Sequence, residues 1–383
     1  MTKTGDLTQL IRRQIEENKG FLPFDRFMAT ALYETGLGYY ESAEVFGGEG
    51  DFITAADLGP WLALGIADLL AWGWENLGKP AEWTLLEQGS GSGRLLGDVL
   101  QLLQQRAMPF PAVVIAIERS ARMRERQRLH FESLGLSVHQ YASLDELHGL
   151  DPCLMFSNEL PDAFPVKCFT WKEGCFFERG VGAGAESAAF VWQDAAEPLT
   201  SPPPITAALT AAWPEGYASE WNPNLASWQQ AVAGSIGRGY VFTVDYGYSQ
   251  AEYYRPGRLT GTLLGHIGHR TSEEVLNNPG SMDITAHVDF TALVEAGLPV
   301  GLEPVSWLSQ GAWLAQSPGV QQQLQQLAAS GKANDIATIA HAKRLLLPFG
   351  MGETFKLLIQ SRGSQTIRPS YLSQFDRLSA LQV

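Results

Sequence analysis

The sequence has few of the residues that would tie a protein to a membrane or cross-link it with disulfides. Its 383 residues include three cysteines, Cys153, Cys168 and Cys175, and no C-x-x-C pair. An odd number of scattered cysteines argues against a disulfide framework and favours a reducing compartment. No run of about 18 apolar residues occurs, so we predict no membrane span. The first residues also lack the apolar core of a signal peptide, so we expect a cytoplasmic protein.

Positive charge and histidine are also scarce. Lysine and arginine number 27 against 41 acidic residues, which gives a net charge of -14 and argues against a broad nucleic-acid surface. The arginine-rich run at residues 119–128 is interleaved with apolar and acidic residues, as on the solvated face of a helix. His266 and His269 lack a third ligand at metal spacing, so we assign no metal. The remaining composition is typical of a globular enzyme of one large or two smaller domains.

A glycine-rich stretch organises the rest of the chain. A short apolar run ends at Glu87, three glycines follow at Gly89, Gly91 and Gly93, and a helical pattern of leucines comes next. This order predicts a strand, a tight loop and a helix. Glycine suits such a loop because it adopts backbone angles that a Cβ forbids and lets a ligand lie against the main chain.

The glycine spacing distinguishes between cofactors. A dinucleotide loop requires G-x-G-x-x-G, but Arg94 or Leu96 would occupy the third glycine position here. The pattern acidic-x-G-x-G-x-G instead resembles motif I of class I S-adenosylmethionine (SAM) methyltransferases. A carboxylate such as Glu87 suits a ligand that carries an ammonium and a sulfonium. The alternative is a glycine-rich turn without a ligand.

A second carboxylate follows the next predicted strand. Residues 111–118 are almost continuously apolar and end at Glu118, about 25 residues after the glycine loop. In a doubly wound sheet this position lies beside a bound nucleoside, where a carboxylate can bind both ribose hydroxyls. Glu118 could instead cap the following helix.

A polar cluster follows the predicted strand at residues 152–157. It contains Asn158, Glu159 and Asp162, at the edge where open α/β sheets carry their chemistry. The alternative is a simple turn. A further strand at residues 239–246 ends near Asp245, and two more are predicted at residues 302–308 and 354–360.

The chain divides into three predicted parts. Residues 1–57 form N-terminal helices and an aromatic, glycine-rich arm, which either folds over the active site or only covers the core. Residues 58–164 and 236–383 form the core. Residues 165–235, rich in glycine, proline and tryptophan, interrupt the βα rhythm as an insertion beside the substrate site.

Taken together, these motifs resemble the MidA-like family of class I SAM methyltransferases over roughly residues 20–360. Its mitochondrial member is a protein-arginine methyltransferase that acts in the assembly of respiratory complex I. The resemblance rests on GYY at 38–40, GDFITA at 50–55, LEQGSGSGRLLGD at 86–98, NELPDAFPV at 158–166, VDYGY at 244–248, DITAHVDF at 283–290, SQGAWL at 309–314 and MGETFKLL at 351–358.

The resemblance implies an α/β fold: a doubly wound, Rossmann-like class I SAM methyltransferase sheet with an N-terminal helical arm and an inserted subdomain. It implies SAM as cofactor and a protein substrate, which could be a subunit of a respiratory or NDH-type complex. The implied SAM-binding residues are Gly50, Asp51, Phe52, Thr54, Glu87, Gly89, Gly91, Gly93, Glu118 and Asn158.

An arginine substrate requires carboxylates, because guanidinium stays protonated near neutral pH. Bidentate pairing aligns one nitrogen with the methyl donor, and a carboxylate then accepts the released proton. Glu159 and Asp162 are the candidates, with Asn158 orienting them. His287 and Asp289 are possible substrate-side groups, although Asp289 could simply cap a helix. A SAM-binding assembly factor with little turnover and a nicotinamide dehydrogenase are the alternative functions.

Overall fold

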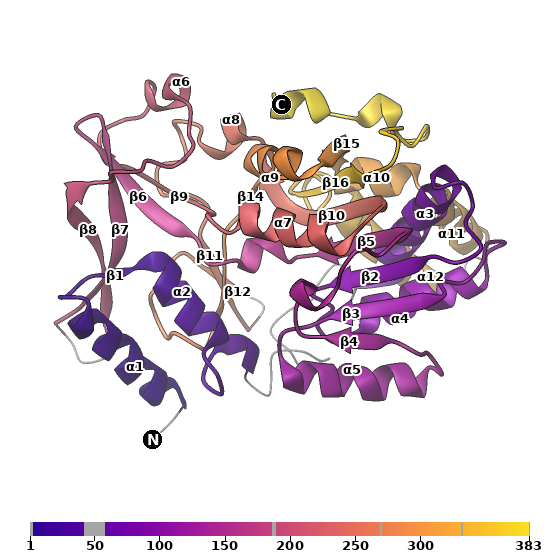
Figure 1. Cartoon of the computed structure of the whole chain (residues 1–383), viewed down its shortest axis with the longest axis horizontal. Helices are drawn as coiled ribbons and strands as arrows, with labels where there is room; N and C mark the ends of the chain where they lie inside the picture. The colour runs from indigo at the N-terminus through magenta and orange to yellow at the C-terminus, as the bar shows by residue number, and fades with distance from the viewer. Residues whose placement is uncertain (1–2, 42–57, 186–188, 269, 331, 383) are drawn as a thin grey trace. The chain divides into compact units, whose positions relative to one another are not determined.

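The computed structural model describes residues 3–41, 58–185, 189–268, 270–330 and 332–382, which fold into two compact units (Figure 1). Unit 1 comprises Met1–Phe52, Pro161–Leu225 and Tyr248–Ala292, and unit 2 comprises Ile53–Leu160, Ala226–Gly247 and Leu293–Val383. The predicted core included residues 248–292, which belong to unit 1. Because compactness does not by itself define function, the predicted three-part division stays a prediction.

Unit 2 contains a mixed sheet in the strand order β15-β16-β10-β5-β2-β3-β4. Its strands are β2 (Thr84–Gln88), β3 (Val113–Ile117), β4 (His139–Tyr141), β5 (Cys153–Asn158), β10 (Gly239–Tyr248), β15 (Leu302–Ser309) and β16 (Phe355–Arg362). Strands β4, β3, β2, β5 and β10 pair in parallel, while β16 is antiparallel to both β10 and β15. The predicted strands are therefore present.

Helices cover both faces of this sheet. The main ones are α3 (Trp61–Asn76), α4 (Arg94–Gln104), α5 (Ala121–Ser133), α7 (Leu225–Ser235), α10 (Gln310–Gln316), α11 (Pro318–Ser330) and α12 (Ala333–Leu346). Side chains alternate between the faces of a strand. Phe242 of β10 packs with the leucines of α3. On β16, Gln360 points to the face opposite its neighbour Ile359 and donates to Gln229 of α7 over 2.9 Å. The sheet is therefore doubly wound, as predicted.

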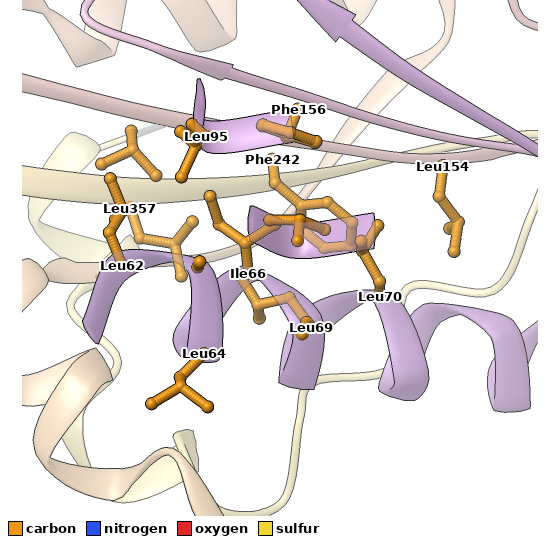
Figure 2. Close-up of a cluster of buried hydrophobic side chains, with 14 of the residues drawn as sticks. Leu62, Leu64, Ile66, Leu69, Leu70, Leu95, Leu154, Phe156, Phe242 and Leu357 are labelled. Atoms are coloured by element: carbon orange, nitrogen blue, oxygen red, sulfur yellow. The ribbon is translucent and has the colours of Figure 1, made fainter. Parts of the chain in front are cut away.

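The core of unit 2 forms where α3 lies on the sheet. Figure 2 shows Leu62, Ile66, Leu69 and Leu70 of α3 among side chains of β5, β10 and β16. All four leucine and isoleucine side chains are fully buried. Burying each contributes roughly 1.5–3 kcal/mol, so this layer holds the strands whose ends carry the predicted site.

The strand order reverses direction between β2 and β5. From β2 the chain proceeds outward to β3 and β4, whereas the later strands β5 and β10 add on the other side. Such a switch point leaves a crevice at the carboxyl ends of the two central strands, where open α/β sheets bind ligands. The glycine loop follows β2 and the polar cluster follows β5, so the fold of unit 2 brings both predicted motifs to this place.

Unit 1 is built mainly from antiparallel strands and the two N-terminal helices. Its elements include α1 (Lys3–Glu17), β1 (Leu22–Pro23), α2 (Phe24–Tyr33), η1 (Tyr39–Glu41), η4 (Pro161–Ala163), β6 (Lys167–Lys172), β7 (Cys175–Ala183), β8 (Phe190–Pro198), α6 (Ala207–Thr210), β9 (Tyr217–Trp221), α8 (Gln250–Tyr253), β11 (Leu264–Ile267), β12 (Arg270–Ser272), β13 (Asp283–Thr285) and β14 (Val288–Asp289). Strand β7 pairs antiparallel with both β6 and β8. Leu7, Ile11 and Ile15 of α1 are buried on one stripe of the helix, and Leu10 beside them is partly buried.

Helix α9 (Phe290–Gly297) follows β14, and short 3-10 turns η3 (Leu144–Glu146), η5 (Leu298–Val300), η6 (Ser373–Phe375) and η7 (Leu378–Leu381) complete the described elements. Across the described ranges, no helix combines the length and the hydrophobicity needed to cross a bilayer.

Gly93 can be tested against a matched glycine in the same unit. Gly93 has φ +78, and a Cβ there would lie 2.8 Å from Phe131 Cζ, whereas Gly78 has φ +86 and open space around it. We expect Gly78→Ala to cost about 1 kcal/mol from backbone strain alone. Gly93→Ala should cost about 2–4 kcal/mol, because overpacking adds to the strain. Urea unfolding midpoints measure both, and equal losses would contradict the packing role of Gly93.

Candidate functional site

The glycine loop lies between β2 and α4 with all three glycines in the left-handed region. Their φ angles are +76 for Gly89, +49 for Gly91 and +78 for Gly93. The main-chain N–H groups of Gly89 and Ser90 both donate to the carbonyl of Ile117, over 2.9 and 3.3 Å. The loop is thus anchored to the end of β3, and it needs glycine because L side chains rarely adopt these angles.

Glu87 is a buried carboxylate at the end of β2, directly before this loop. Its side chain is 3% exposed, and Oε2 has no hydrogen-bond partner among the described residues. Burial raises the pKa of Glu87 to about 8. The Ser90 hydroxyl lowers this pKa in part, and the negative charge of Glu118 raises it further. A buried carboxyl with an unsatisfied oxygen is costly, so it favours a cationic ligand.

Glu118 lies against the glycine loop as the sequence predicted. Its Oε2 accepts the Gly91 N–H over 3.1 Å, and its Oε1 accepts the Ser120 N–H over 3.0 Å. The cap of α5 is Ser120, whose hydroxyl accepts the Met123 N–H, so Glu118 does not take the N-cap position. The half-buried carboxylate therefore stands between the loop and the helix start. Its role toward a ribose stays a prediction.

Gln127 supports the loop from α5, and the sequence analysis missed it. Its Nε2 donates to the Gly91 carbonyl over 2.8 Å, and its Oε1 accepts from Gln140 Nε2 over 2.8 Å. The side chain is fully buried. Met123, Gln127 and Phe131 recur every four residues and form the inner stripe of α5. This spacing could have revealed Gln127 within a run that was interpreted as a solvated face.

Asn158 and Glu159 occupy the carboxyl end of β5. Asn158 Nδ2 donates to Glu159 Oε1 over 3.0 Å, while Asn158 Oδ1 is buried and has no hydrogen-bond partner among the described residues. Glu159 has φ +51, an unusual backbone angle for a residue with a side chain. Such strain is concentrated at binding and catalytic sites. The simple-turn alternative does not account for the buried, unsatisfied amide oxygen.

Asp162 lies in η4 of unit 1, where it is 4% exposed. Its carbonyl accepts the Ala286 N–H over 3.0 Å, and the next carbonyl, of Ala163, accepts the Tyr33 hydroxyl over 2.7 Å. These bonds hold the Asp162 backbone between α2 and the segment after β13. Because Glu159 falls in unit 2, the predicted pairing of the two carboxylates stays a prediction.

A second carboxylate in unit 1 was not predicted. The Tyr40 hydroxyl donates to both oxygens of Asp283, over 2.9 and 3.0 Å, and Tyr33 stacks on the Tyr40 ring. Burial first, then the charge of Asp283, raises the pKa of Tyr40 well above its usual value, and Asp162 contributes in the same direction. The motifs that begin at residues 38 and 283 therefore meet inside unit 1, where the negative charges of Asp283 and Asp162 both act on the Tyr40 hydroxyl.

One protein family matches most of the chain. The family described as "Putative S-adenosyl-L-methionine-dependent methyltransferase" matches residues 65–306, which is more than half of the sequence. The chain belongs to this family. The matched range contains the glycine loop, Glu118 and the Asn158–Glu159 pair, so the motifs and the geometry agree with the family.

Two further comparisons extend the match beyond that range. A Burkholderia thailandensis crystal structure bound to S-adenosyl-homocysteine is similar at a TM-score of 0.89 and 29% identity, covering 99% of this chain and 97% of that one. The mitochondrial protein arginine methyltransferase NDUFAF7 homolog of Drosophila melanogaster is 25% identical, covering 94% of this chain and 85% of that protein. The Danio rerio protein arginine methyltransferase NDUFAF7 is 25% identical, covering 86% and 81%.

These findings confirm the predicted fold class, the SAM-dependent methyltransferase activity and SAM as methyl donor. They also confirm the resemblance to the MidA-like family of class I SAM methyltransferases. The nicotinamide alternative fails on the same findings. The individual residue roles remain predictions, and Gly50, Asp51, Phe52 and Thr54 lie outside the described residues.

The residues at the end of β2 fit this donor. SAM carries an ammonium and a sulfonium, and the buried Glu87 carboxyl offers one oxygen, Oε2, that has no hydrogen-bond partner among the described residues. Gly89, Gly91 and Gly93 keep side chains off the loop, and Glu118 and Asn158 add polar groups on the two neighbouring strand ends. When bound, SAM supplies an electrophilic methyl carbon.

Asp289 and His287, the two possible substrate-side groups, have different surroundings. Asp289 Oδ1 accepts the N–H groups of Thr291 and Ala292 over 3.0 and 3.1 Å, so Asp289 caps α9, and its substrate-side role stays a prediction. The His287 ring is parallel to Tyr248, with 5.2 Å between the ring centroids.

His266 Nε2 contacts Thr285 Oγ1 over 3.3 Å, and His269 lies outside the described residues. In the ranges that the structure describes, no three acidic, histidine or cysteine side chains gather in a metal-binding arrangement.

Glu87 should release a proton when SAM binds. With a pKa raised to about 8, the carboxyl is mainly protonated at pH 7 in the free protein, and a cationic ligand favours its ionised form. We expect release of about one proton at pH 7 and an affinity that rises as pH increases toward 8. Titration calorimetry in buffers of different ionisation enthalpy measures the release.

Glu87→Gln should abolish the release and weaken binding, while Glu82→Gln, at an exposed position, should change neither. Equal proton release by the wild type and by Glu87→Gln would show that another group titrates.

Proposed function

We propose that this methyltransferase methylates the guanidinium of an arginine side chain in a protein substrate. The curated relatives named above are protein arginine methyltransferases, which supports this choice of acceptor. The observation that carries the proposal is the Glu159 carboxylate bound by the Asn158 amide at the end of β5, followed three residues later by the buried carboxylate of Asp162. A carboxylate binds the planar guanidinium of arginine through two parallel hydrogen bonds. The ammonium of lysine is a point charge and cannot make this bidentate pair.

The proposed chemistry needs orientation and a proton acceptor. A bond forms between a guanidinium nitrogen and the donor methyl carbon as the carbon–sulfur bond breaks, and the guanidinium loses one proton. Asn158 holds Glu159 through its amide, which orients the Glu159 carboxylate. Glu159 or Asp162 then accepts the proton, because either carboxylate can bind the opposite edge of the guanidinium.

We further propose that the substrate is a subunit of a respiratory or NDH-type complex, and that the reaction takes place in the cytoplasm. The first proposal follows from the resemblance to the MidA-like family, and the second from the sequence composition. The net charge of -14 also suits a basic protein segment as substrate.

Glu159→Gln and Asp162→Asn should each abolish methyl transfer while SAM binding stays measurable by calorimetry. Each change removes a negative charge that pairs with guanidinium but leaves the glycine loop intact. In the assay, each variant is incubated with labelled SAM and with an extract from cells that lack this protein, and the extract supplies the unmethylated protein substrate. Glu82→Gln, at an exposed glutamate, is the control.

Equal loss of methylation and SAM binding would reassign Glu159 and Asp162 to donor binding. Label transfer that never exceeds the background of a protein-free control would instead favour an assembly factor with little turnover.

The acceptor itself can be identified by mass spectrometry. We expect at least one methyl-arginine site to disappear from the proteome of cells that lack this chain and to return with the wild type but not with Glu159→Gln. Loss of methyl groups from lysine or glutamine residues, with arginine unchanged, would contradict the proposed acceptor.

A further inference from the structure

The unusual backbone of Glu159 is held in place by the neighbouring strand β10. With φ +51, the residue adopts a conformation that side chains disfavour, so the surrounding structure must maintain it. The Glu159 N–H donates to the Val244 carbonyl over 3.0 Å. The next N–H, of Leu160, donates to Asp245 Oδ2 over 3.2 Å. Consecutive residues of β10 therefore bind consecutive N–H groups of the turn.

Asp245 is suited to this role by its own environment. Its side chain is completely buried, and its other oxygen, Oδ1, accepts the Tyr246 N–H over 2.8 Å. The two oxygens are thus bound in two directions, which fixes the plane of the carboxylate. In the antiparallel register of β10 and β16, Asp245 stands opposite Lys356, which is 3% exposed. The Lys356 ammonium donates to the carbonyls of Glu353 and Thr354.

The conformation of this turn sets the direction of the Asn158 and Glu159 side chains. Asn158 donates to the Glu159 side chain, so the two side chains move together with the turn. If the Leu160 N–H loses its acceptor, the backbone of Glu159 can relax toward negative φ, and both side chains change direction. A displacement of about 1 Å at a reacting group can lower a rate about a hundredfold.

We infer that Asp245 is a positioning residue of the methyl-transfer site. By accepting the Leu160 N–H, it keeps the Glu159 backbone in the conformation that directs the side chains of Asn158 and Glu159 toward the arginine substrate. This inference rests on the proposed function, because it takes Glu159 as a group that contacts the acceptor. Asp245 itself is buried and acts through the turn. Its effect should therefore appear in turnover and in the backbone at residues 159–160, rather than in the glycine loop.

The test compares Asp245→Ala and Asp245→Asn with a control in the same strand. Thr243→Val is the matched control, since Thr243 is fully buried on the same face of β10 and its hydroxyl has no hydrogen-bond partner among the described residues. Asparagine retains one carbonyl oxygen but places an amide nitrogen at the other position, so only one of the two N–H groups keeps an acceptor.

We expect Asp245→Ala to lower kcat between about ten- and a hundredfold, with the Kd for SAM changed less than about threefold. Amide exchange at Leu160, followed by NMR, should accelerate, while exchange at Gly91 and Gly93 stays the same. Asp245→Asn should fall between the alanine variant and the wild type. Thr243→Val should match the wild type in every measurement.

Unchanged Leu160 exchange in Asp245→Ala would overturn the inference, as would parallel losses of turnover and SAM binding. If Asp245→Ala does not fold, Asp245→Asn carries the same test, because it must still accelerate Leu160 exchange or lower kcat. If the wild type transfers no methyl group to arginine, the proposed function fails, while the Leu160 exchange still reports on Asp245. If the wild type is active and both variants match it, only the Asp245 inference fails.

Discussion

The predicted site depends on a constraint of the backbone: three alternate residues of the short loop between β2 and α4 take positive φ. Only glycine satisfies this condition at Gly89, Gly91 and Gly93 without strain. The loop keeps its shape because Ile117 binds it from β3 and Gln127 binds it from α5. The sheet and the inner stripe of α5 therefore determine the position of the loop.

Electrostatics around this loop favour positive charge. Glu87 is buried with an unsatisfied oxygen, and its pKa rises to about 8, so the free protein holds a proton there that the unfolded chain lacks at neutral pH. Between pH 4.5, the ordinary pKa of a glutamate, and about 8, this group lowers the free energy of unfolding as pH rises. A bound cation would offset that disadvantage, which supports the predicted role of Glu87 toward a cationic donor.

Much of the fold and part of the site could be predicted from the sequence because they depend on local patterns. Apolar runs predicted the strands that end at Glu87, Glu118 and Asn158, and the parallel topology then placed these ends at one switch point. Gln127 was missed because its role depends on which face of α5 turns inward. The Tyr40–Asp283 contact was missed because it joins segments 243 residues apart. No local pattern specifies such a contact.

The same reasoning explains why a polar cluster five residues long could be located but not interpreted residue by residue. Asn158 ends β5 in unit 2 and Glu159 follows it, whereas Asp162 is buried in unit 1, where its carbonyl accepts the Ala286 N–H. The positive φ of Glu159 marks the place where the chain leaves the strand at a conformational cost. A fold would not retain that cost, together with a buried unsatisfied amide oxygen on Asn158, if a simple turn served equally well. The strain and the unsatisfied oxygen therefore argue against a simple turn at the end of β5, and they support the proposal of a site there.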